Sequence, residues 1–372
     1  MRVGINAHVL GTEVGGDKNY VRNVIRALGA IDPAGDYTLF LGTPLPTEPI
    51  LGAEQMRRVV VEPYNPFIRM PVTFPLALVR EQIDVVHVQY IAPPICPARI
   101  VVTVHDISYE RYPQFFTPAA VTQLRALVPL TIRHAATVLT VSEFSRQDII
   151  RRYRVPSEKV VVAHGSADPM FQPIHDVARL AAVREKYGTG ERFILCVGNL
   201  QPRKNLVTLI NAYVRLRQAN ATRHKLVLVG GRSWLYDDIF AAARDSGYAD
   251  EFVFTGFVTD DDLVALYNAA ELFVYPSLFE GFGAPPLEAM ACGAPVVTTN
   301  TSSIPEVVGD AALLVDPLDV DGLARAMTTA LSNPALRAQL SIRGRERASA
   351  FSWDAAARTI LKVYRNAAGE QQ

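Results

Sequence analysis

The sequence predicts two doubly wound α/β domains, each with a mainly parallel sheet covered by helices. Short apolar, β-branched runs alternate with amphipathic stretches of helical length along the whole chain, which is typical of βαβ units. The alternation stops once, after Gly165, where the segment SADPMFQPIHD has neither a strand period nor a helix period. With 372 residues, the chain is long enough for a separate core in each domain.

Apolar runs place the strands of both domains. In the first domain we expect strands at residues 2–7, 38–41, 58–61, 85–88, 100–104, 138–141 and 160–163, and helices at 20–28 and 118–135. In the second domain the expected strands are FILCVGNL, KLVLVG, FVFTGF, LFVYPS, PVVTTN and AALLV, with helices between them. A helix-rich stretch from residue 319 to about 368 follows.

These elements predict a division of the chain into four parts. Residues 1–168 form the N-terminal Rossmann-like domain, 169–190 a linker and hinge, 191–350 the C-terminal Rossmann-like domain, and 351–372 a helix that packs back on the first domain. Ligands of parallel sheets bind at the carboxyl ends of the strands. We therefore expect the two sheets to face each other across a cleft that holds the active site.

Composition excludes several classes of function. Lys plus Arg equals Asp plus Glu, at 37 each, so no overall field selects nucleic acid and we expect no such partner. The three cysteines are far apart and the histidines lack HExxH or HxH spacing, which predicts no disulfide framework and no metal site. We find no signal peptide and no run of about 20 apolar residues, and expect a cytoplasmic protein.

The most informative motif is YPSLFEGFGAPPLEAMACG, from Tyr275 to Gly293. It combines a strand end, a loop carrying Glu280 and a helix start carrying Glu288. Pro285 and Pro286 suit the first turn of a helix, where a missing amide hydrogen costs nothing.

The expected helix start is also an anion site. The amides of Phe282, Gly283 and Ala284 would lie at the positive end of the helix dipole, which favours a phosphate. A carboxylate repels a phosphate, so each glutamate is better used accepting hydrogen bonds from hydroxyls on either side of it. A sugar nucleotide has this layout, whereas an ordinary strand–loop–helix joint with two surface glutamates is the alternative.

A second motif, VGNLQPRKN, places Arg203 and Lys204 at the start of a helix. Two cations there oppose the helix dipole unless an anion binds them. A diphosphate suits both, because Arg203 can bind two oxygens while Lys204 acts as a point charge. A solvated surface pair is the alternative.

Two features of the first domain are further candidates. His105 and Asp106 follow the strand IVVTV and so lie at a carboxyl end, although a lone histidine is more often structural. The loop GTEVGGDKNY carries Gly15 and Gly16 before a helix, where free amides can meet a ligand even though no complete phosphate-binding spacing is present.

The segment TVSEFSRQDIIRRYRVP combines Ser142, a predicted N-cap, with a helix rich in arginine. Arg146, Arg151, Arg152 and Arg154 form a local cationic patch. It is either the solvated face of a packed helix or a surface attracted to an anionic membrane or a lipid-linked acceptor.

Together these motifs resemble the retaining GT-B glycosyltransferases of glycosyltransferase family 4. The resemblance rests on FEGFGAPPLEAMACGAPVV, with seven residues between its two glutamates, and on GNLQPRKN upstream of it. It covers nearly the entire chain, because TVHDISYERYP, TVSEFSRQDI, TGFVTDDDL and SSIPEVVGDAALLVDP also occur in the expected order.

The resemblance implies transfer of a hexose, with retained configuration, from a nucleotide diphosphate sugar bound mainly by the second domain to a hydroxyl presented by the first. Arg203 and Lys204 would neutralise the diphosphate in place of a metal, so no cofactor is implied. Glu288 would accept from the ribose hydroxyls, and Glu280 would orient the hexose. His105 would approach the sugar.

The resemblance also implies a full set of site residues. The catalytic set is His105, Glu280, Arg203 and Lys204. The donor-binding set is Gly15, Gly16, Ser142, Arg203, Lys204, Phe257, Val258, Glu280, Phe282, Gly283, Ala284, Leu287 and Glu288. Within it, the backbone at Phe257 and Val258 would hold the base and Gly16 the diphosphate.

The finer assignments follow from local sequence. The HDIS.ERYP pattern looks most like bacterial mannosyltransferases of polysaccharide assembly, which favours GDP-mannose over UDP- or ADP-sugars. The segment AHGSADPMF departs from the Asn-Gly of many relatives, and GGDKNY departs from their glycine-arginine pattern. The loops GGDKNY and YIAPPICPAR are expected to contact a glycan, lipid-linked or small-molecule acceptor. A nucleotide-sugar 2-epimerase and a non-catalytic binding protein of the same fold are the alternatives.

Overall fold

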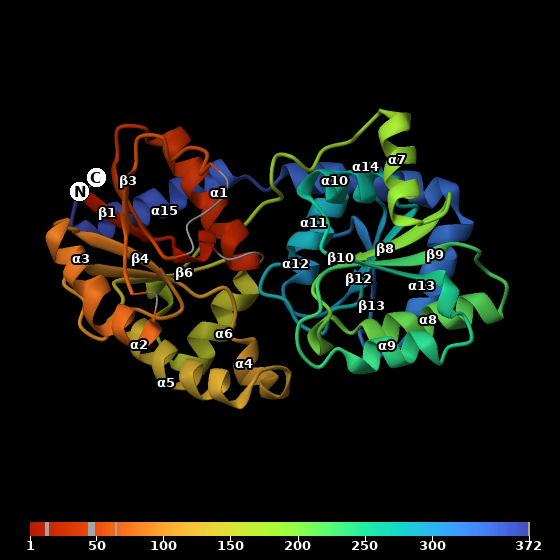
Figure 1. The fold of residues 1–372 in the computed structure, drawn as a ribbon, viewed down its shortest axis with the longest axis horizontal. Coiled ribbons are helices and arrows are strands. Elements are labelled where there is room, and N and C mark those ends of the chain that lie inside the picture. The colour runs from red at the N-terminus through yellow and green to blue at the C-terminus, as the bar shows by residue number, and fades with distance from the viewer. Residues whose placement is uncertain (12–14, 44–48, 64, 371–372) are drawn as a thin grey trace. The chain divides into compact units, whose positions relative to one another are not determined.

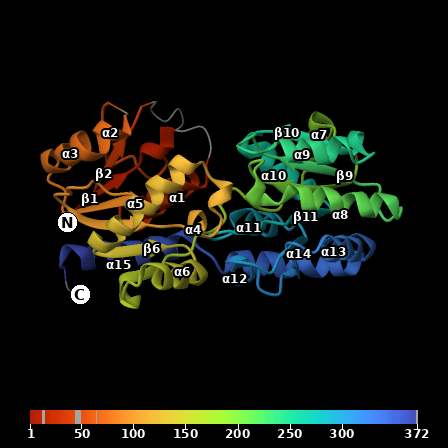
Figure 2. The same ribbon diagram turned by 90° about the horizontal axis from the view of Figure 1, so that it is seen from below.

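The computed structural model describes residues 1–11, 15–43, 49–63 and 65–370 of the chain. The chain divides into two compact units (Figures 1 and 2). Unit 1 comprises Met1–Gly165 together with Ser352–Gln372, and unit 2 comprises Ser166–Phe351. Each unit has its own sheet and its own hydrophobic core.

Unit 1 contains a seven-stranded parallel sheet in the order β3-β2-β1-β4-β5-β6-β7. Its strands are β1 (Arg2–Asn6), β2 (Asp36–Leu41), β3 (Arg57–Val60), β4 (Val85–Gln89), β5 (Arg99–Thr103), β6 (Thr137–Thr140) and β7 (Val160–Val162). All seven lie within one or two residues of the ranges expected from the sequence, because buried parallel strands appear as short apolar runs.

The helical elements of unit 1 lie in the connections between these strands. They are α1 (Gly16–Ile31), α2 (Pro66–Ile68), the π-helical turn η2 (Arg69–Thr73), α3 (Phe74–Arg80), α4 (Ser108–Arg111), α5 (Pro118–His134), α6 (Glu143–Tyr153) and, from the end of the chain, α15 (Trp353–Ala368). Helix α1 begins four residues earlier than expected, so Gly16 is its first residue and not part of the preceding loop.

The connection between β4 and β5 in unit 1 contains no helix. Residues 90–98, between β4 and β5, contain Pro93, Pro94 and Pro97. Proline lacks an amide hydrogen and disfavours helix in the residue before it. The part of the sheet that a crossover helix would cover is therefore crossed only by this loop.

Unit 2 contains a six-stranded parallel sheet in the order β10-β9-β8-β11-β12-β13. Its strands are β8 (Phe193–Val197), β9 (Lys225–Val229), β10 (Phe252–Gly256), β11 (Leu272–Tyr275), β12 (Val296–Thr299) and β13 (Ala312–Val315). Its α-helices are α7 (Val177–Tyr187), α8 (Leu206–Gln218), α9 (Asp237–Arg244), α10 (Asp260–Ala269), α11 (Ala284–Ala291), α12 (Ile304–Val308), α13 (Val320–Ser332) and α14 (Pro334–Ser349). The six strand sequences expected for the second domain are all confirmed.

The segment 169–190, expected as a linker, carries a helix that packs within unit 2. Helix α7 lies against α10, where Asp262 accepts hydrogen bonds from Lys186 Nζ at 2.6 Å and from the Tyr187 hydroxyl at 2.9 Å. The chain passes from unit 1 to unit 2 at Gly165 and returns at Ser352.

The returning helix α15 packs on α1 and on β5 in unit 1. Its Tyr364 is fully buried, and the Tyr364 hydroxyl lies 2.6 Å from His87 Nδ1. The other ring nitrogen of His87 lies 2.7 Å from the Thr103 hydroxyl. Burial lowers the pKa of His87 to about 3, so this histidine is a neutral link between α15 and the sheet.

Candidate functional site

In unit 2, one carboxylate gathers the cations that the sequence singled out. Glu280, in the loop after β11, accepts from Lys204 Nζ at 2.7 Å through Oε1 and from Arg203 Nη1 at 2.8 Å through Oε2. The hydroxyls of Tyr275 and Ser277 also donate to Oε1, at 2.8 and 2.6 Å. We call these five residues the Glu280 cluster.

The local chain path brings the two cations to this loop. Arg203 and Lys204 belong to a short 3-10 turn (Pro202–Lys204) between β8 and α8, and so precede the helix start where they were expected. Asn205 ends the turn in the left-handed conformation, with φ 57°, and its side-chain amide donates to the carbonyls of Pro276 and Pro317. This turn is thereby fixed to the carboxyl end of β11.

Burial and charge together set the ionisation of the cluster. Glu280 is buried, which opposes its ionisation, but Arg203 and Lys204 outweigh that effect and lower the pKa of Glu280 to about 2. Burial lowers the pKa of Lys204 below its usual range, although Glu280 beside it acts in the opposite direction. Glu280 is therefore a carboxylate at neutral pH.

Helix α11 begins beside the cluster, as expected. Gly283 precedes it in the left-handed region, with φ 106°, and a Cβ built there would lie 2.7 Å from Ile304 Cδ1. Glycine is required here by both conformation and space. Pro285 and Pro286 occupy the first turn and have no amide hydrogen, so Ala284 carries the one amide hydrogen among the first three residues of α11.

The remaining unit 2 residues of the expected donor site differ in their burial and in their contacts. Glu288 Oε2 accepts from the Tyr267 hydroxyl at 2.9 Å. Phe282 is half-buried and its ring packs edge-on against Phe351. Leu287 is fully buried in the core of unit 2, and its expected contact with the donor stays a prediction.

Phe257 and Val258, expected to hold the base, follow β10. Phe257 is 55% exposed, and its ring lies over Gly231, where a Cβ would come within 2.2 Å of the ring. Gly231 was not singled out from the sequence, although the pair Gly230–Gly231 directly after a strand is the kind of signal that marks close packing at a strand end.

In unit 1, His105 lies just beyond the carboxyl end of β5. Its Nε2 is 2.9 Å from Gln89 Oε1 and 3.5 Å from Asp17 Oδ1. The ring of Tyr20 packs edge-on against it at 4.6 Å, and the ring of Tyr90 lies at 5.8 Å. Sequence reasoning missed Gln89, Tyr20 and Tyr90, although Gln89 is the polar end of an otherwise apolar strand.

The other unit 1 candidates have different surroundings. Among the described residues, no atom lies within 4 Å of where a Cβ on Gly15 or Gly16 would lie. Ser142 is fully buried and its hydroxyl accepts from the Ser145 amide at 3.1 Å, which confirms the predicted N-cap of α6. Its expected contact with a donor stays a prediction.

The arginine-rich helix α6 is partly used for packing. Arg146 donates to the carbonyls of Val160 and Ser157. Arg152 and Arg154 instead line a surface pocket of about 270 Å³ together with three residues from α5 and α4, namely Arg125, Arg133 and Glu110. This basic pocket is net positive, because Glu110 is its one acid against four arginines.

The described residues were also searched for metal-binding groups and for membrane-spanning helices. In the part of the chain that the structure describes, no group of three or more histidine, cysteine or acidic side chains is arranged to hold a metal ion. Across the same residues, we find no helix with the length and apolar content needed to cross a membrane.

Two family models match the chain. The model described as Glycosyltransferase Family 4 matches residues 14–170, and the model described as Glycosyl transferases group 1 matches residues 181–347. The second match contains the Glu280 cluster and the start of α11. The first contains Gly15, Gly16, His105 and Ser142.

Curated relatives extend this match. O-antigen chain mannosyltransferase B of Escherichia coli is 36% identical over 269 residues, which cover 72% of this chain and 70% of that protein. A serotype-specific mannosyltransferase of the same organism is 36% identical over 222 residues, which cover 59% of this chain and 27% of that longer protein.

Solved structures agree on the fold. Sucrose-phosphate synthase from Thermosynechococcus elongatus has a TM-score of 0.79 at 22% identity, covering 98% of each chain. A glycosyltransferase from Rickettsia africae has a TM-score of 0.76 at 18% identity, covering 99% of this chain and 98% of the other. With its two parallel-sheet units and both family matches, this chain belongs to glycosyltransferase family 4 and is a glycosyltransferase of the GT-B fold.

Proposed function

We propose that this glycosyltransferase transfers a hexose, with mannose favoured, from a nucleotide diphosphate sugar to a hydroxyl of a glycan, lipid-linked or small-molecule acceptor. We further propose that it retains the anomeric configuration and needs no metal. The similarity to O-antigen mannosyltransferases supports mannose, and hence GDP-mannose as the favoured donor, with UDP- and ADP-sugars as alternatives.

The Glu280 cluster is the observation that carries the proposal. It holds two cations and one carboxylate in a buried setting, so it keeps a net positive charge next to the start of α11. Fixed, desolvated positive charge stabilises a leaving diphosphate most strongly when that group gains charge in the transition state. Arg203 and Lys204 would therefore do the work of a divalent ion.

The ionisation of Glu280 limits its role. With its pKa lowered to about 2, Glu280 holds no proton at neutral pH and is unsuited to act as a general acid. Its carboxylate instead fixes Arg203 and Lys204, and in the donor complex it would also orient hexose hydroxyls. We propose that the acceptor hydroxyl itself supplies the proton to the leaving group.

The proposed step conserves atoms and charge as follows. The bond between the anomeric carbon and the diphosphate oxygen breaks, and the acceptor oxygen bonds to that carbon from the same face. The acceptor proton passes to the leaving diphosphate oxygen. His105, held by Gln89, would approach the sugar, and the start of α1 at Gly16 would contact the diphosphate.

We also propose peripheral contact with an anionic membrane at the inner, cytoplasmic face. The basic pocket on α5 and α6 supports this, because clustered arginines are attracted to anionic headgroups. Vesicle sedimentation of the Arg133→Glu variant tests it, since binding that is unaffected by this charge reversal would contradict the contact.

The donor is identified by thermal shift with GDP, UDP and ADP and their mannose, glucose and N-acetylglucosamine conjugates, measured with EDTA. We expect GDP and GDP-mannose to raise Tm selectively, because a ligand that binds only the folded state stabilises it. No shift with any nucleotide would contradict the donor class, and a shift that EDTA abolishes would contradict metal independence. Nuclear magnetic resonance of the product tests retention.

The role of the cations is tested by Arg203→Ala. We expect kcat to fall about 100-fold or more, as when a donor to a developing anion is removed. Arg217→Ala is the matched control, because Arg217 also pairs with a glutamate in unit 2, and its side chain is 18% exposed against 17% for Arg203. Equal losses in the two variants would show a structural effect and contradict the assigned role.

A further inference from the structure

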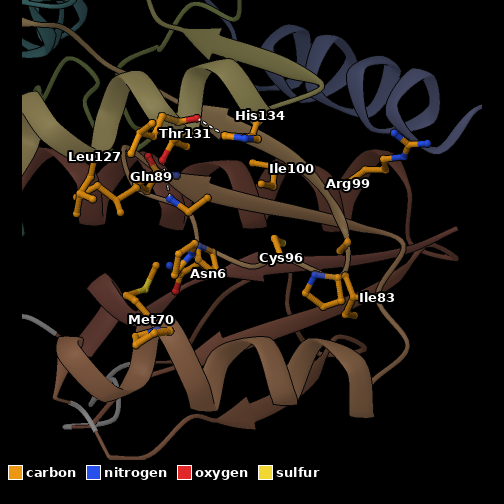
Figure 3. A pocket seen from close by; sticks show the side chains of 18 of the residues that line it. Asn6, Met70, Ile83, Gln89, Cys96, Arg99, Ile100, Leu127, Thr131 and His134 are labelled. Carbon is orange, nitrogen blue, oxygen red and sulfur yellow. Dashed lines mark hydrogen bonds between the residues drawn. The ribbon is translucent and has the colours of Figure 1, made fainter.

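Unit 1 contains a large trench that the glycosyl-transfer site does not account for. It has a volume of about 1640 Å³, which exceeds the roughly 300–1,000 Å³ of an ordinary small-molecule pocket. One wall is formed by residues 66–71 and the other by α5. Figure 3 shows Met70 on one side, Thr131 and His134 on the other, and Ile100 between them.

The trench exists because the β4–β5 connection has no helix. A helix there would cover the sheet between the two walls, but residues 90–98 only cross it as a loop tied to α5 by the Ala92 amide, which donates to the Thr131 hydroxyl at 3.1 Å. Ile83 and Ile100 line the uncovered part. The floor is therefore apolar.

Apolar side chains also remain exposed along both walls. Phe67 is 85% exposed, Leu127 37% and Leu130 49%, and all three line the trench. Exposed apolar surface of this extent marks a site that meets an apolar partner.

Polar groups line the α5 wall, at Gln123, Thr131 and His134, and charged groups lie at both ends of the trench. At the carboxyl edge of the sheet, Arg69 Nη2 donates to Asn6 Oδ1 at 2.6 Å, and His8 lies beside them. Burial and the nearby Arg69 lower the pKa of His8 to about 4, so Arg69 is the charged member of this group at neutral pH. At the opposite edge, the Met1 amine is paired with Glu370 at 3.5 Å. The cationic end suits an anionic headgroup.

The cationic end is also the end next to the proposed reaction site. Gln89 lines the trench and its Oε1 lies 2.9 Å from His105 Nε2. A ligand with its phosphate near Arg69 and its tail along the trench would thus present its headgroup toward His105. Binding to a membrane surface would not require one end of the trench to point toward His105, whereas binding of the acceptor would. We therefore take the acceptor as the occupant.

We propose that the trench binds the apolar chain of the acceptor, a long-chain phosphate-linked glycan, with its phosphate toward Arg69 and its sugar toward His105. The inference rests on the proposed function, because it assumes that the acceptor reaches His105. It adds the chemical class of the acceptor and the surface that selects it.

Binding of farnesyl phosphate, below its critical micelle concentration and without nucleotide, tests the inference. Farnesol, which has only the apolar chain, and inorganic phosphate, which has only the headgroup, are the controls. We expect farnesyl phosphate to bind more tightly than either. Equal binding of farnesyl phosphate and inorganic phosphate would overturn the inference, because the chain would then contribute nothing.

Substitutions locate the site. The triple variant Phe67→Gln, Leu127→Gln and Leu130→Gln is expected to raise the Kd for farnesyl phosphate about tenfold, because it removes apolar contacts of three side chains. The matched control is Val177→Gln, Leu318→Gln and Ile342→Gln, which changes three exposed apolar side chains of unit 2. Equal Kd values for the two variants would overturn the inference.

Three further outcomes separate the competing explanations. If nucleotide diphosphates bind normally to the trench variant, and its Kd for farnesyl phosphate equals that of the wild type, the inference fails and the proposed function stands. If no nucleotide binds, the proposed function fails by itself. A dimer of the wild type that the trench variant dissociates would overturn the inference in favour of a second copy of the chain.

Discussion

At the residue scale, Glu280 organises the proposed donor site in unit 2. Its carboxylate accepts from two cations and two hydroxyls, so its removal would release four side chains at once. Buried ion clusters often add little net stability, because desolvation offsets attraction. We therefore interpret the cluster as an arrangement that holds Arg203 and Lys204 in place for the diphosphate of the proposed donor.

The Glu280→Gln variant is expected to lose about 3–5 kcal/mol of unfolding free energy at neutral pH, because Arg203 and Lys204 lose their compensating charge. The pKa of Glu280 is lowered from 4.5 to about 2. Its ionised form therefore stabilises the fold fully above about pH 4.5, and this contribution is lost as the pH falls toward 2. Urea unfolding of both proteins across this range measures it, and a difference that does not shrink at low pH would contradict it.

The members of this site could be predicted only in part. Glu280, Arg203 and Lys204 were found because each breaks a local pattern, the cations by opposing a helix dipole and the glutamate by lying among glycines. Their mutual contact was not predicted, since seventy or more residues separate them. Tyr275 and Ser277 are in the same motif, but the direction of a side chain at a strand end does not follow from spacing.

At the scale of single elements, the start of α11 depends on Gly283. Gly283→Ala is expected to cost about 1–3 kcal/mol, because the residue has φ 106° and its new Cβ would meet Ile304. Gly188→Ala is the control, since Gly188 also has positive φ, at 62°, but no atom lies within 4 Å of its Cβ position. Chemical denaturation compares the two, and equal costs would show that crowding by Ile304 contributes nothing.

The failure to predict some elements from the sequence has physical reasons. Strands were found to within three residues because their apolar runs are short and complete. Helices α2 and α3 were missed because Pro66, Pro71 and Pro75 interrupt the segment, although two of these prolines lie in first turns, where proline is tolerated. The trench was also not predicted. It results from the absence of a helix between β4 and β5, and the sequence pattern does not show what such an absence leaves uncovered.

At the scale of the whole molecule, α15 joins the end of the chain to unit 1. Tyr364→Phe removes the hydroxyl that meets His87 and is expected to lower the free energy of unfolding by about 1–3 kcal/mol, because a buried ring nitrogen loses its partner. Tyr187→Phe, at the surface of unit 2, is the control and should cost less. Equal effects on thermal unfolding would contradict a special role for the α15 contact.

The two crossings between the units at Gly165 and Ser352 have a consequence for the order of assembly. During synthesis, unit 2 emerges from the ribosome as one uninterrupted stretch, whereas unit 1 must wait for Tyr364 and its neighbours before His87 and α1 are covered. Unit 1, whose synthesis begins first, is therefore the last to complete its fold. A chain that stopped after unit 2 would have an intact unit 2 and an unfinished unit 1, whose uncovered apolar surface would be exposed to aggregation and to proteases.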